Sequence, residues 1–415
     1  MSSMSGHKGH LDIEDVKERF SGKMLIYTLL VFSLVFTFFV ASYDINLYFY
    51  ASTFIVSYLK APTLFIGISV SAFTLGVIIF ATVGGIAFNR ISIKLIILLS
   101  LIFATSGSVL TGFVENVPEL FLLRFLVGMG TGMLQGTVMG FMGTAYPEKR
   151  GFLLSLTGIA FSIGLLFGPY SESFIAPLYL ESFLIAGVIG VASILLVLAF
   201  MPNVYSGRGE KRRLSRKGLF NRNTTLVFTG IFFYGIGFFG FIGYFSHFLI
   251  NYLHMSQFIS AITASMLGIG GIIFTLPFGY ASDRIGRKNV LLLLYGLLAV
   301  TSFIIFGVYM NSVALIVISF IFGASYNGLI IVIAASAQDY ADKGSVGAAS
   351  GLVFTFYYAG GIIGGTFFGV MLSFVNFRLT GVISVTTFMI IGFLTSAFLT
   401  RNEKIHGVTV SPEEA

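Results

Sequence analysis

Long apolar runs separated by short polar stretches follow one another along almost the whole chain. A helix needs about 20 residues to cross the roughly 30 Å hydrocarbon layer of a bilayer. Twelve runs meet that length, with approximate spans 24–50, 63–88, 93–113, 118–145, 151–174, 178–201, 224–253, 257–280, 289–310, 312–338, 345–374 and 379–400. The pattern predicts an all-α membrane protein with twelve transmembrane helices, because a helix satisfies all of its backbone hydrogen bonds within lipid.

Composition agrees with this pattern and removes other classes of protein. Of the 415 residues, 56% are hydrophobic and 10% are charged, and the mean hydropathy is +0.95, which excludes a soluble, disordered or collagen-like chain. The absence of Cys excludes disulfides, thiolate metal sites and cysteine nucleophiles, and we expect no cofactor or metal. The net charge of +7 lies mostly in short stretches between apolar runs, so lipid headgroups explain it better than nucleic acid.

The distribution of Lys and Arg predicts the orientation in the membrane, because cytoplasmic loops retain positive charge. With the N-terminus inside, 21 of the 24 Lys and Arg residues face the cytoplasm, and the exceptions are Lys60, Arg124 and Arg378. An even number of spans places the C-terminus inside as well. The predicted parts are a cytoplasmic tail (1–23), a six-helix bundle (24–201), a basic cytoplasmic linker (202–223), a second six-helix bundle (224–400) and a cytoplasmic tail (401–415).

The polar segment before the first span is expected to stay in the mature chain, because the apolar region of a signal peptide is only about 7 to 15 residues long. Within this segment, Ile13, Val16 and Phe20 share one face at helical spacing. The stretch from Asp12 to Phe20 is therefore predicted to be an amphipathic helix on the inner membrane surface. A frayed tail is the alternative.

Two pairs of loops reveal an internal repeat. GIAFNRISIK begins at Gly85 and GYASDRIGRK begins at Gly279, an offset of 279 − 85 = 194. The segments YPEK at Tyr146 and YADK at Tyr340 show the same offset, 340 − 146 = 194. Two homologous six-helix halves are typical of some secondary transporters, in which the solute site lies at the interface of the repeats.

Two segments carry a family resemblance. GYASDRIGRK at 279–288 matches the GxxxDRxGRK signature of the major facilitator superfamily, and RFLVGMGTG from Arg124 resembles its RxxxGxGxG signature. The likeness covers residues 11–400. In the first copy of the loop, Asn89 and Ile93 replace the aspartate and an arginine of the signature.

Within that superfamily, a branch resemblance comes from the N-terminal region. DIEDVKERF, followed by YDINLY from Tyr43, resembles the metabolite:proton and aromatic-acid:proton symporters. The sequences of sugar porters expected after helices six and twelve are absent. The resemblance implies a proton-coupled transporter that works by alternating access around a midplane site.

Two ionisable side chains lie inside the apolar spans, where each costs roughly 2.5 to 3.5 kcal/mol on insertion scales. Asp44 lies about 30 Å along the first span, and Arg124 about 9 Å from the outer end of the fourth, so both are expected near the outer leaflet. We predict an ion pair that is broken by protonation of Asp44 or by an arriving substrate. A static pair that only fixes helix packing is the alternative. A freed, buried Arg124 favours a substrate carboxylate.

Other polar side chains deep in the spans are candidates for substrate contact, because such groups usually face a cavity or another helix. Helix periodicity or proximity groups one set with Asp44 and Arg124: Ser33, Thr37, Asn46, Tyr48 and Gln135. Span seven adds Tyr244, His247 and Asn251, and span ten adds Tyr326, Asn327 and Gln338. A helix-to-helix hydrogen bond is the alternative for each, and His247 is the only one that titrates near neutral pH.

The signature loop between spans eight and nine is interpreted as mechanical rather than catalytic. Its residues are Gly279, Asp283, Arg284, Gly286, Arg287 and Lys288. They are expected to form a charge cluster with Asp339 or Asp342 at the end of span ten, which latches one conformational state. Charges that only set the topology are the alternative, above all for Arg287 and Lys288.

Patterns that are typical of enzymes are absent or better explained by packing. GIGFFG from Gly235 matches a dinucleotide fingerprint by letters, but it lies inside an apolar helix. Neither HExxH nor GxSxG occurs. GPYSES from Gly168 partly resembles the GPxxGG element of drug:proton antiporters. Glu172 in that segment and Glu181 are expected to be exposed at the outer ends of spans five and six.

Together these observations predict a proton-coupled symporter in the cell membrane. Its partners are a small-molecule substrate, the proton and the bilayer, and it is expected to function as a monomer. A small organic anion is the favoured substrate. The alternatives are a drug:proton antiporter and a sugar or polyol transporter of the same fold, with an intramembrane enzyme as a remote one.

Overall fold

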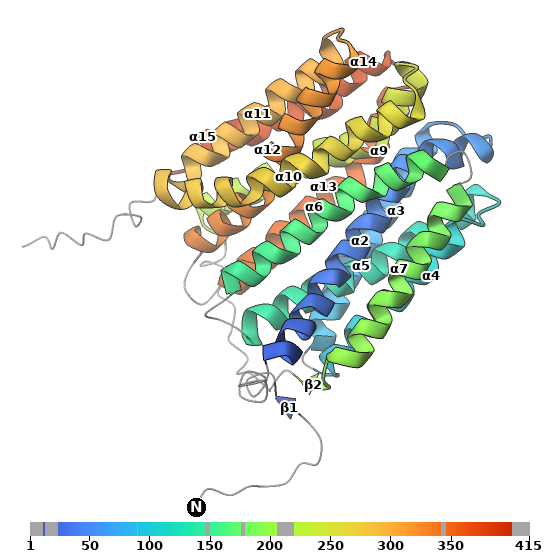
Figure 1. Cartoon of the computed structure of the whole chain (residues 1–415). Helices are drawn as coiled ribbons and strands as arrows, with labels where there is room; N and C mark the ends of the chain where they lie inside the picture. Colours follow the sequence, from blue (N-terminus) through green and yellow to red (C-terminus); the bar gives the residue numbers. More distant parts are fainter. Residues whose placement is uncertain are drawn as a thin grey trace, which may run out of the picture.

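Long helices lie side by side through the whole molecule (Figure 1). The computed structural model describes residues 11–12, 24–88, 90–145, 150–175, 179–205, 220–341 and 346–400. Nearly all of these residues are helical, which confirms the predicted all-α class. The helices of the first half are α2 (Met24–Tyr58), α3 (Leu64–Phe88), α4 (Ile93–Thr111), α5 (Val117–Ala145), α6 (Arg150–Ile175) and α7 (Tyr179–Phe200).

The second half also contains six helical segments in the described part of the chain. They are α9 (Arg222–His247) with its π-helical continuation η2 (Phe248–Tyr252), α10 (Gln257–Ile285), α11 (Arg287–Gly307), α12 (Ser312–Tyr340), α13 (Val346–Met371), and α14 (Phe377–Gly381) continued by η3 (Val382–Thr386) and α15 (Thr387–Ala397). Following the predicted orientation, we call the end of the molecule with Tyr58, Leu64 and Thr111 the outer end, and the opposite end the inner end.

Membrane crossing is supported by the length and composition of the helices. In the described residues, eleven helices are long and apolar enough to span a membrane. The remaining long helix, α6, has 26 residues, about 39 Å at 1.5 Å per residue, and it packs between α2 and α10. The observed helices agree with the predicted spans to within a few residues. The exception is α2, which continues to Tyr58 instead of ending near residue 50.

Small polar side chains begin several helices of the second half. The Asn221 side chain accepts a hydrogen bond from the Thr224 backbone N–H, and the Thr224 side chain bonds back to the Asn221 backbone, which forms a capping box. Ser256, Asn311 and Asn376 each accept a hydrogen bond from the backbone N–H three residues later. These caps satisfy donors that the first turn of a helix leaves free.

A short parallel strand pair links the start of the chain to the segment after α7. β1 (Leu11–Asp12) pairs with β2 (Val204–Tyr205), with Leu11 opposite Val204. The amphipathic helix predicted from Asp12 is wrong at its first residue, which lies in this strand. The rest of that helix, residues 13–20, lies outside the described residues, as do 206–219 of the predicted linker.

The same pairs of helices pack together in the two halves. α2 packs on α6, α3 on α5 and α4 on α7, and correspondingly α9 packs on α13, α10 on α12 and α11 on α15. Gly76 of α3 and Gly270 of α10 allow close approach, because an added Cβ would lie 3.0 Å from the Met129 nitrogen and 2.5 Å from the Ala324 nitrogen. Their separation, 270 − 76 = 194, equals the loop offset. The halves meet where α3 packs on α13 and α6 on α10.

Candidate functional site

Asp44 on α2 and Arg124 on α5 lie close together in the interior of the first half. The Arg124 Nη1 atom is 3.9 Å from Asp44 Oδ2, and the two side chains, Arg124 and Asp44, are 1% and 8% exposed. Neither carboxylate oxygen of Asp44 has a hydrogen-bond partner among the described residues. At this distance the contact is electrostatic and not a hydrogen bond, so the pair lacks the bidentate geometry that strengthens Arg–carboxylate contacts.

Neutral groups hold the Arg124 guanidinium in place. Its Nη2 donates a hydrogen bond of 2.5 Å to Thr111 Oγ1 at the end of α4. The guanidinium carbon lies 4.1 Å from the centre of the Tyr48 ring, a cation–π contact. The Tyr48 hydroxyl in turn donates to Ser69 Oγ of α3 at 2.6 Å. Arg124 therefore has anchors that do not depend on the charge of Asp44.

Asp44 lies farther from the end of its helix than the predicted span implied. α2 continues 14 residues past Asp44 (58 − 44 = 14), about 21 Å, so Asp44 is not near the end of its helix. Arg124 lies seven residues after Val117 (124 − 117 = 7), about 10 Å along α5. The two side chains still meet, because α2 continues outward past the level where α4 ends at Thr111.

A small cavity adjoins Asp44 between α2, α4, α5 and α7. Its lining residues are Val40, Ala41, Asp44, Leu101, Ala104, Thr105, Ser108, Thr131, Leu134 and Ala186. The hydroxyls of Thr105, Ser108 and Thr131 have no hydrogen-bond partner among the described residues. The cavity has room for about one water molecule. These hydroxyls are therefore free to solvate a protonated or charged Asp44.

Three predicted substrate residues of α2 bond within their own helix. Ser33 donates to the Leu30 carbonyl and Thr37 to the Leu34 carbonyl, both at 2.7 Å. The Asn46 amide donates to the Ser42 carbonyl at 2.8 Å. All three are buried, and no described contact joins them to Asp44 or Arg124.

A second group of predicted residues meets where the two halves pack together. Tyr358 of α13 donates to Gln135 Oε1 of α5 at 3.0 Å. Ser162 of α6 donates to Asn327 Oδ1 of α12 at 3.2 Å. The Tyr326 ring stacks on that of Phe238 with 4.2 Å between ring centres. Amide and phenol groups on α5, α12 and α13 thus gather near the interface of the halves.

Tyr244, His247 and Asn251 lie nearer the outer end, also between the halves. Thr53 of α2 contacts His247 Nδ1 at 2.6 Å and donates to Asn251 Oδ1 at 3.3 Å. The Tyr244 hydroxyl accepts from the Gly67 backbone N–H at 3.0 Å. We call these five residues the outer seal. Their placement agrees with the helix-to-helix alternative better than with direct substrate contact.

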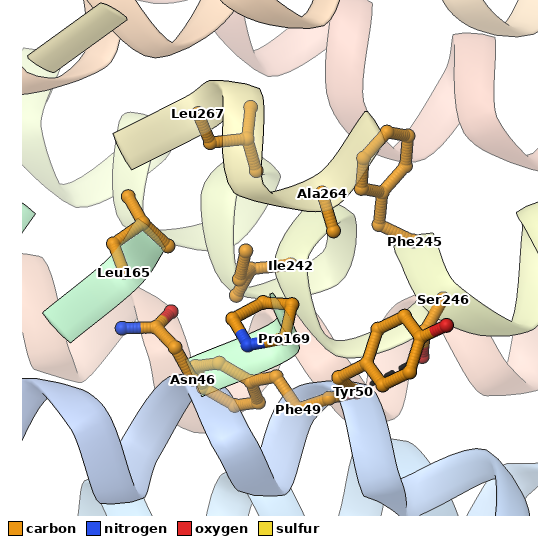
Figure 2. A pocket seen from close by; sticks show the side chains of 10 residues that line it. All are labelled: Asn46, Phe49, Tyr50, Leu165, Pro169, Ile242, Phe245, Ser246, Ala264 and Leu267. Carbon is orange, nitrogen blue, oxygen red and sulfur yellow. Dashed lines mark hydrogen bonds between the residues drawn. The ribbon is translucent and has the colours of Figure 1, made fainter. Parts of the chain in front are cut away.

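The outer half of the interface is closely packed. Figure 2 shows a cavity between α2, α6, α9 and α10 that is lined by Asn46, Phe49, Tyr50, Leu165, Pro169, Ile242, Phe245, Ser246, Ala264 and Leu267. Its walls are mainly apolar, and Ser246 Oγ donates across it to the Phe49 carbonyl at 3.0 Å. It has room for about one water molecule.

The inner-end cluster is centred on Arg287, at the start of α11. Its guanidinium contacts Asp283 Oδ1 at 2.5 Å, Asp339 Oδ2 at 2.7 Å and Ser282 Oγ at 2.5 Å. Half-buried Gln338 precedes Asp339 on α12. The cluster joins α10, α11 and α12 of the second half, and in the described residues it makes no ion pair to the first half.

The other signature residues have separate partners. Arg284 is exposed and lies 4.6 Å from the centre of the Tyr280 ring, and Lys288 donates to the Leu399 carbonyl at 2.7 Å. Gly286 turns the chain between α10 and α11 with φ of +95°, which glycine adopts far more readily than other residues. Gly279 lies near Ile331 of α12. Asp342 lies outside the described residues.

Glu172 on α6 is a residue that the sequence interpretation placed wrongly. It is 0% exposed, and both of its carboxylate oxygens lack a hydrogen-bond partner in the described part of the chain. Glu181 on α7 is exposed, as expected. The sequence contains a sign of this special position, because Glu172 lies only three residues before the end of an apolar helix. An ionisable side chain inside a membrane span is energetically unfavourable and is a functional candidate for that reason.

The described ranges show no cluster of side chains that could hold a metal ion. They contain no group of three or more His, Asp or Glu residues placed to hold a metal ion. The chain has no Cys, and each of the two cavities described above accepts about one water.

Comparison with known proteins identifies the family. The model of the family described as Major Facilitator Superfamily matches residues 34–364 and 227–414. The uncharacterized MFS-type transporter YfkF of Bacillus subtilis is 28% identical over 45% of this chain and 49% of its own length, so the match spans about half of that relative. The hexuronate transporter of the same organism is 24% identical over 76% of this chain and 80% of its own. Multidrug resistance protein MdtG of Proteus mirabilis is 28% identical over 49% of this chain and 53% of its own.

Solved structures share the fold. A point mutant of the nucleoside transporter NupG superposes with a TM-score of 0.76 at 15% identity. The match covers 89% of this chain and 100% of that one. At this identity the likeness shows the fold alone.

Proposed function

This chain belongs to the Major Facilitator Superfamily, and on that premise we propose that it is a proton-coupled symporter that imports a small organic anion by alternating access. The family and the relatives described above are transporters, so the chain is a multi-pass membrane transporter and not an enzyme. The observation that carries the finer proposal is the buried Asp44–Arg124 pair at 3.9 Å.

Proton coupling follows from the weakness of this pair. At 3.9 Å and an effective dielectric constant of about 20, the attraction is about 4 kcal/mol, and no hydrogen bond adds to it. Protonation of Asp44 removes this attraction and leaves a buried guanidinium without a counterion, which is unfavourable. An anion that binds Arg124 restores the balance of charge, so the proton and the anion bind together.

The substrate class follows from the groups around Arg124 and at the interface of the halves. A carboxylate suits the guanidinium, because both are planar and can form two parallel hydrogen bonds. Gln135, Asn327 and Tyr326 provide amide and phenol groups for hydroxyls on the same substrate. The similarity to a hexuronate transporter supports this combination, because a hexuronate is a sugar that carries one carboxylate. Access to Arg124 requires movement of Tyr48, which covers one face of the guanidinium.

The architecture proposed for this cycle has two bundles, 24–201 and 224–400, related by a pseudo-twofold axis, with both termini in the cytoplasm. The repeated helix pairs support this arrangement. Thr53 and His247 support it further, because they contact each other and differ by the repeat offset, 247 − 53 = 194. Equivalent residues meet in this way beside a twofold axis. We propose that each monomer is one transport unit.

Transport in liposomes tests the function. The purified protein is reconstituted, a pH gradient with an alkaline interior is imposed, and uptake of radiolabelled D-glucuronate is measured with competing oxalate, acetate and glucose. We expect gradient-driven uptake that carboxylates inhibit. Arg124→Lys is expected to impair it despite keeping the charge, and Glu181→Gln, on an exposed residue of α7, is the control. Inhibition by glucose but by no carboxylate would overturn the anion assignment.

A drug:proton antiporter of the same fold is the second candidate, supported by the similarity to MdtG. The same liposomes distinguish the two, because an antiporter accumulates its substrate when the interior is acidic rather than alkaline. A neutral sugar or polyol remains the alternative substrate within the symport proposal, and glucose in the competition assay addresses it.

A further inference from the structure

Glu172 is a buried carboxyl group that the coupling pair does not use. It lies three residues before the end of α6 at the outer end of the molecule. The side chain is 0% exposed and neither oxygen has a hydrogen-bond partner in the described part of the chain. Burying an ionised carboxylate without a partner costs several kcal/mol. Burial in this conformation therefore favours the neutral, protonated form of Glu172.

The helices around Glu172 bring no cation to it. From α2 the titratable neighbours are the phenols of Tyr43 and Tyr50, which lie within electrostatic range of the carboxyl group. From α7 the neighbour is the Ser182 hydroxyl, which lies close enough to act on the Glu172 carboxyl group as a hydrogen-bond donor, although the pair does not have the geometry of a full hydrogen bond. α10 carries no charged residue before Asp283 at its inner end. α5 contributes Arg124, which is directed at Asp44, and no ion pair to Glu172 is found among the described residues.

Contacts between the two halves lie close to Glu172, because Tyr50 is within electrostatic range of it and Phe174 follows it by two residues on α6. The Tyr50 hydroxyl donates to the Gln257 carbonyl, the first residue of α10, at 2.7 Å. Phe174 of α6 packs edge-on against Phe258 of α10, with 6.2 Å between ring centres. In Figure 2 the Tyr50 ring lies beside Pro169 of α6, under Ala264 and Phe245 of the second half. Both contacts join the halves at the outer end, so outward opening must break them and expose the region of Glu172 to water.

A side-chain hydrogen bond joins the helices that carry Asp44 and Glu172, through residues adjacent to each of them in sequence. Tyr43 precedes Asp44 on α2, and its hydroxyl lies 2.8 Å from Ser171 Oγ, on the residue before Glu172. Ser171 Oγ donates to the Gly168 carbonyl at 3.0 Å, so the Tyr43 hydroxyl is the donor to Ser171. The Tyr43 phenol lies within electrostatic range of both carboxyl groups, which α2 and α6 hold at separate sites.

We propose that Glu172 is a second proton-binding site of the transport cycle, loaded from the outside when the outer contacts open and sealed when they close. This inference rests on the proposed symport function. Asp44 and Glu172 each bind one proton, so two protons accompany each substrate. With a monocarboxylate the cycle then moves two positive charges and one negative charge inward, a net charge of +1.

The first experiment needs no substrate. Infrared difference spectra of the purified protein in lipid, recorded between acidic and alkaline pH, report protonated carboxyl groups through their C=O stretching bands. We expect two buried carboxyl bands, of which Glu172→Gln removes one and Asp44→Asn removes the other, while Glu181→Gln removes neither. Labelling the wild-type chain with [13C]glutamate should shift the Glu172 band alone, which serves as the test if a variant does not fold. Bands that neither Glu172→Gln nor the label affects would overturn the proposal.

The second experiment measures the charge moved per cycle. In liposomes with an imposed potassium diffusion potential, each net charge changes the accumulation ratio of D-glucuronate by about 50-fold per 100 mV. The wild type is expected to respond to the potential, whereas Glu172→Gln should accumulate D-glucuronate with the pH gradient alone. A potential response retained in Glu172→Gln would reject the second site while leaving the symport function intact. Absence of uptake in the wild type would reject the proposed substrate, and the infrared result would still decide on Glu172.

Discussion

Asp44→Asn is the substitution that separates a coupling pair from a static one. Asparagine preserves the shape of the side chain and removes its charge, so Arg124 loses the attraction of about 4 kcal/mol estimated from the 3.9 Å separation. In the wild type at alkaline pH, a substrate anion must compete with the Asp44 carboxylate for Arg124. That competition weakens anion binding by up to about 10³-fold, because each 1.4 kcal/mol corresponds to a factor of ten.

Binding of D-glucuronate to the purified protein, measured across pH, is the assay. For the wild type we expect affinity to fall as pH rises and Asp44 ionises. For Asp44→Asn we expect affinity that is independent of pH and close to the acidic value of the wild type. The anchors of Arg124 on Thr111 and Tyr48 do not involve Asp44, so the guanidinium should keep its position. In liposomes this variant should exchange substrate across the membrane but accumulate less of it than the wild type, because only the proposed proton site at Glu172 remains.

Two results would refute this reasoning. Uphill, pH-driven uptake at the wild-type level by Asp44→Asn would show that Asp44 is not the coupling group. Pure destabilisation would appear as a lower melting temperature with pH-dependent binding unchanged, which is the behaviour of a static pair. Glu181→Gln removes a carboxylate from an exposed position and should alter neither measurement.

Further predictions concern topology and packing. A cysteine introduced at Ser215 should be shielded from impermeant thiol reagents in intact cells, whereas one at Asn116 should be labelled from outside; the reverse pattern would invert the orientation. Thr53→Ala removes two contacts of the outer seal, each worth about 0.5 to 1.5 kcal/mol. Spin-label distances across the outer end should then show about fivefold more of the open state for each kcal/mol lost. Thr53→Ser keeps the hydroxyl and should not increase the open state. Gly268→Ala places a Cβ 2.5 Å from the Leu166 nitrogen of α6. This crowding should lower the free energy of unfolding by about 1 to 3 kcal/mol and therefore lower the melting temperature. Gly351→Ala, where an added Cβ meets open space, is the control and should leave the melting temperature unchanged.

Much of the architecture could be predicted without coordinates. Eleven helices of the described residues are apolar runs of membrane-spanning length, and that requirement is local, so these helices follow from composition along the chain. The starts at Asn221, Ser256 and Asn311 are local too, because a capping side chain serves the next turn of its own helix. The continuation of α2 to Tyr58 was missed because its outer part carries more polar residues, which protein rather than lipid covers.

The grouping of the candidate residues could be predicted only in part. The pairing of Asp44 with Arg124 could be predicted, because an ionisable side chain is energetically unfavourable in lipid and the two residues were placed at a similar depth in the membrane. The division of the other residues could not be predicted: Tyr244, His247 and Asn251 lie in the outer seal, Gln135 and Asn327 bond between the halves, and Ser33 and Thr37 bond within α2. The contacts between helices each depend on a partner that is distant in sequence.

Sequence by itself determined the class, the number of helices, their approximate ends and the family, since these depend on apolar length, caps and the GYASDRIGRK signature. Only the tertiary structure decided which faces of the helices meet. In a membrane the surface toward lipid is as apolar as the surface toward another helix, so periodicity does not reveal the buried face. For that reason the sequence suggests an exposed helix end at Glu172, although the side chain is fully buried beside Tyr43 and Tyr50 of α2 and Ser182 of α7.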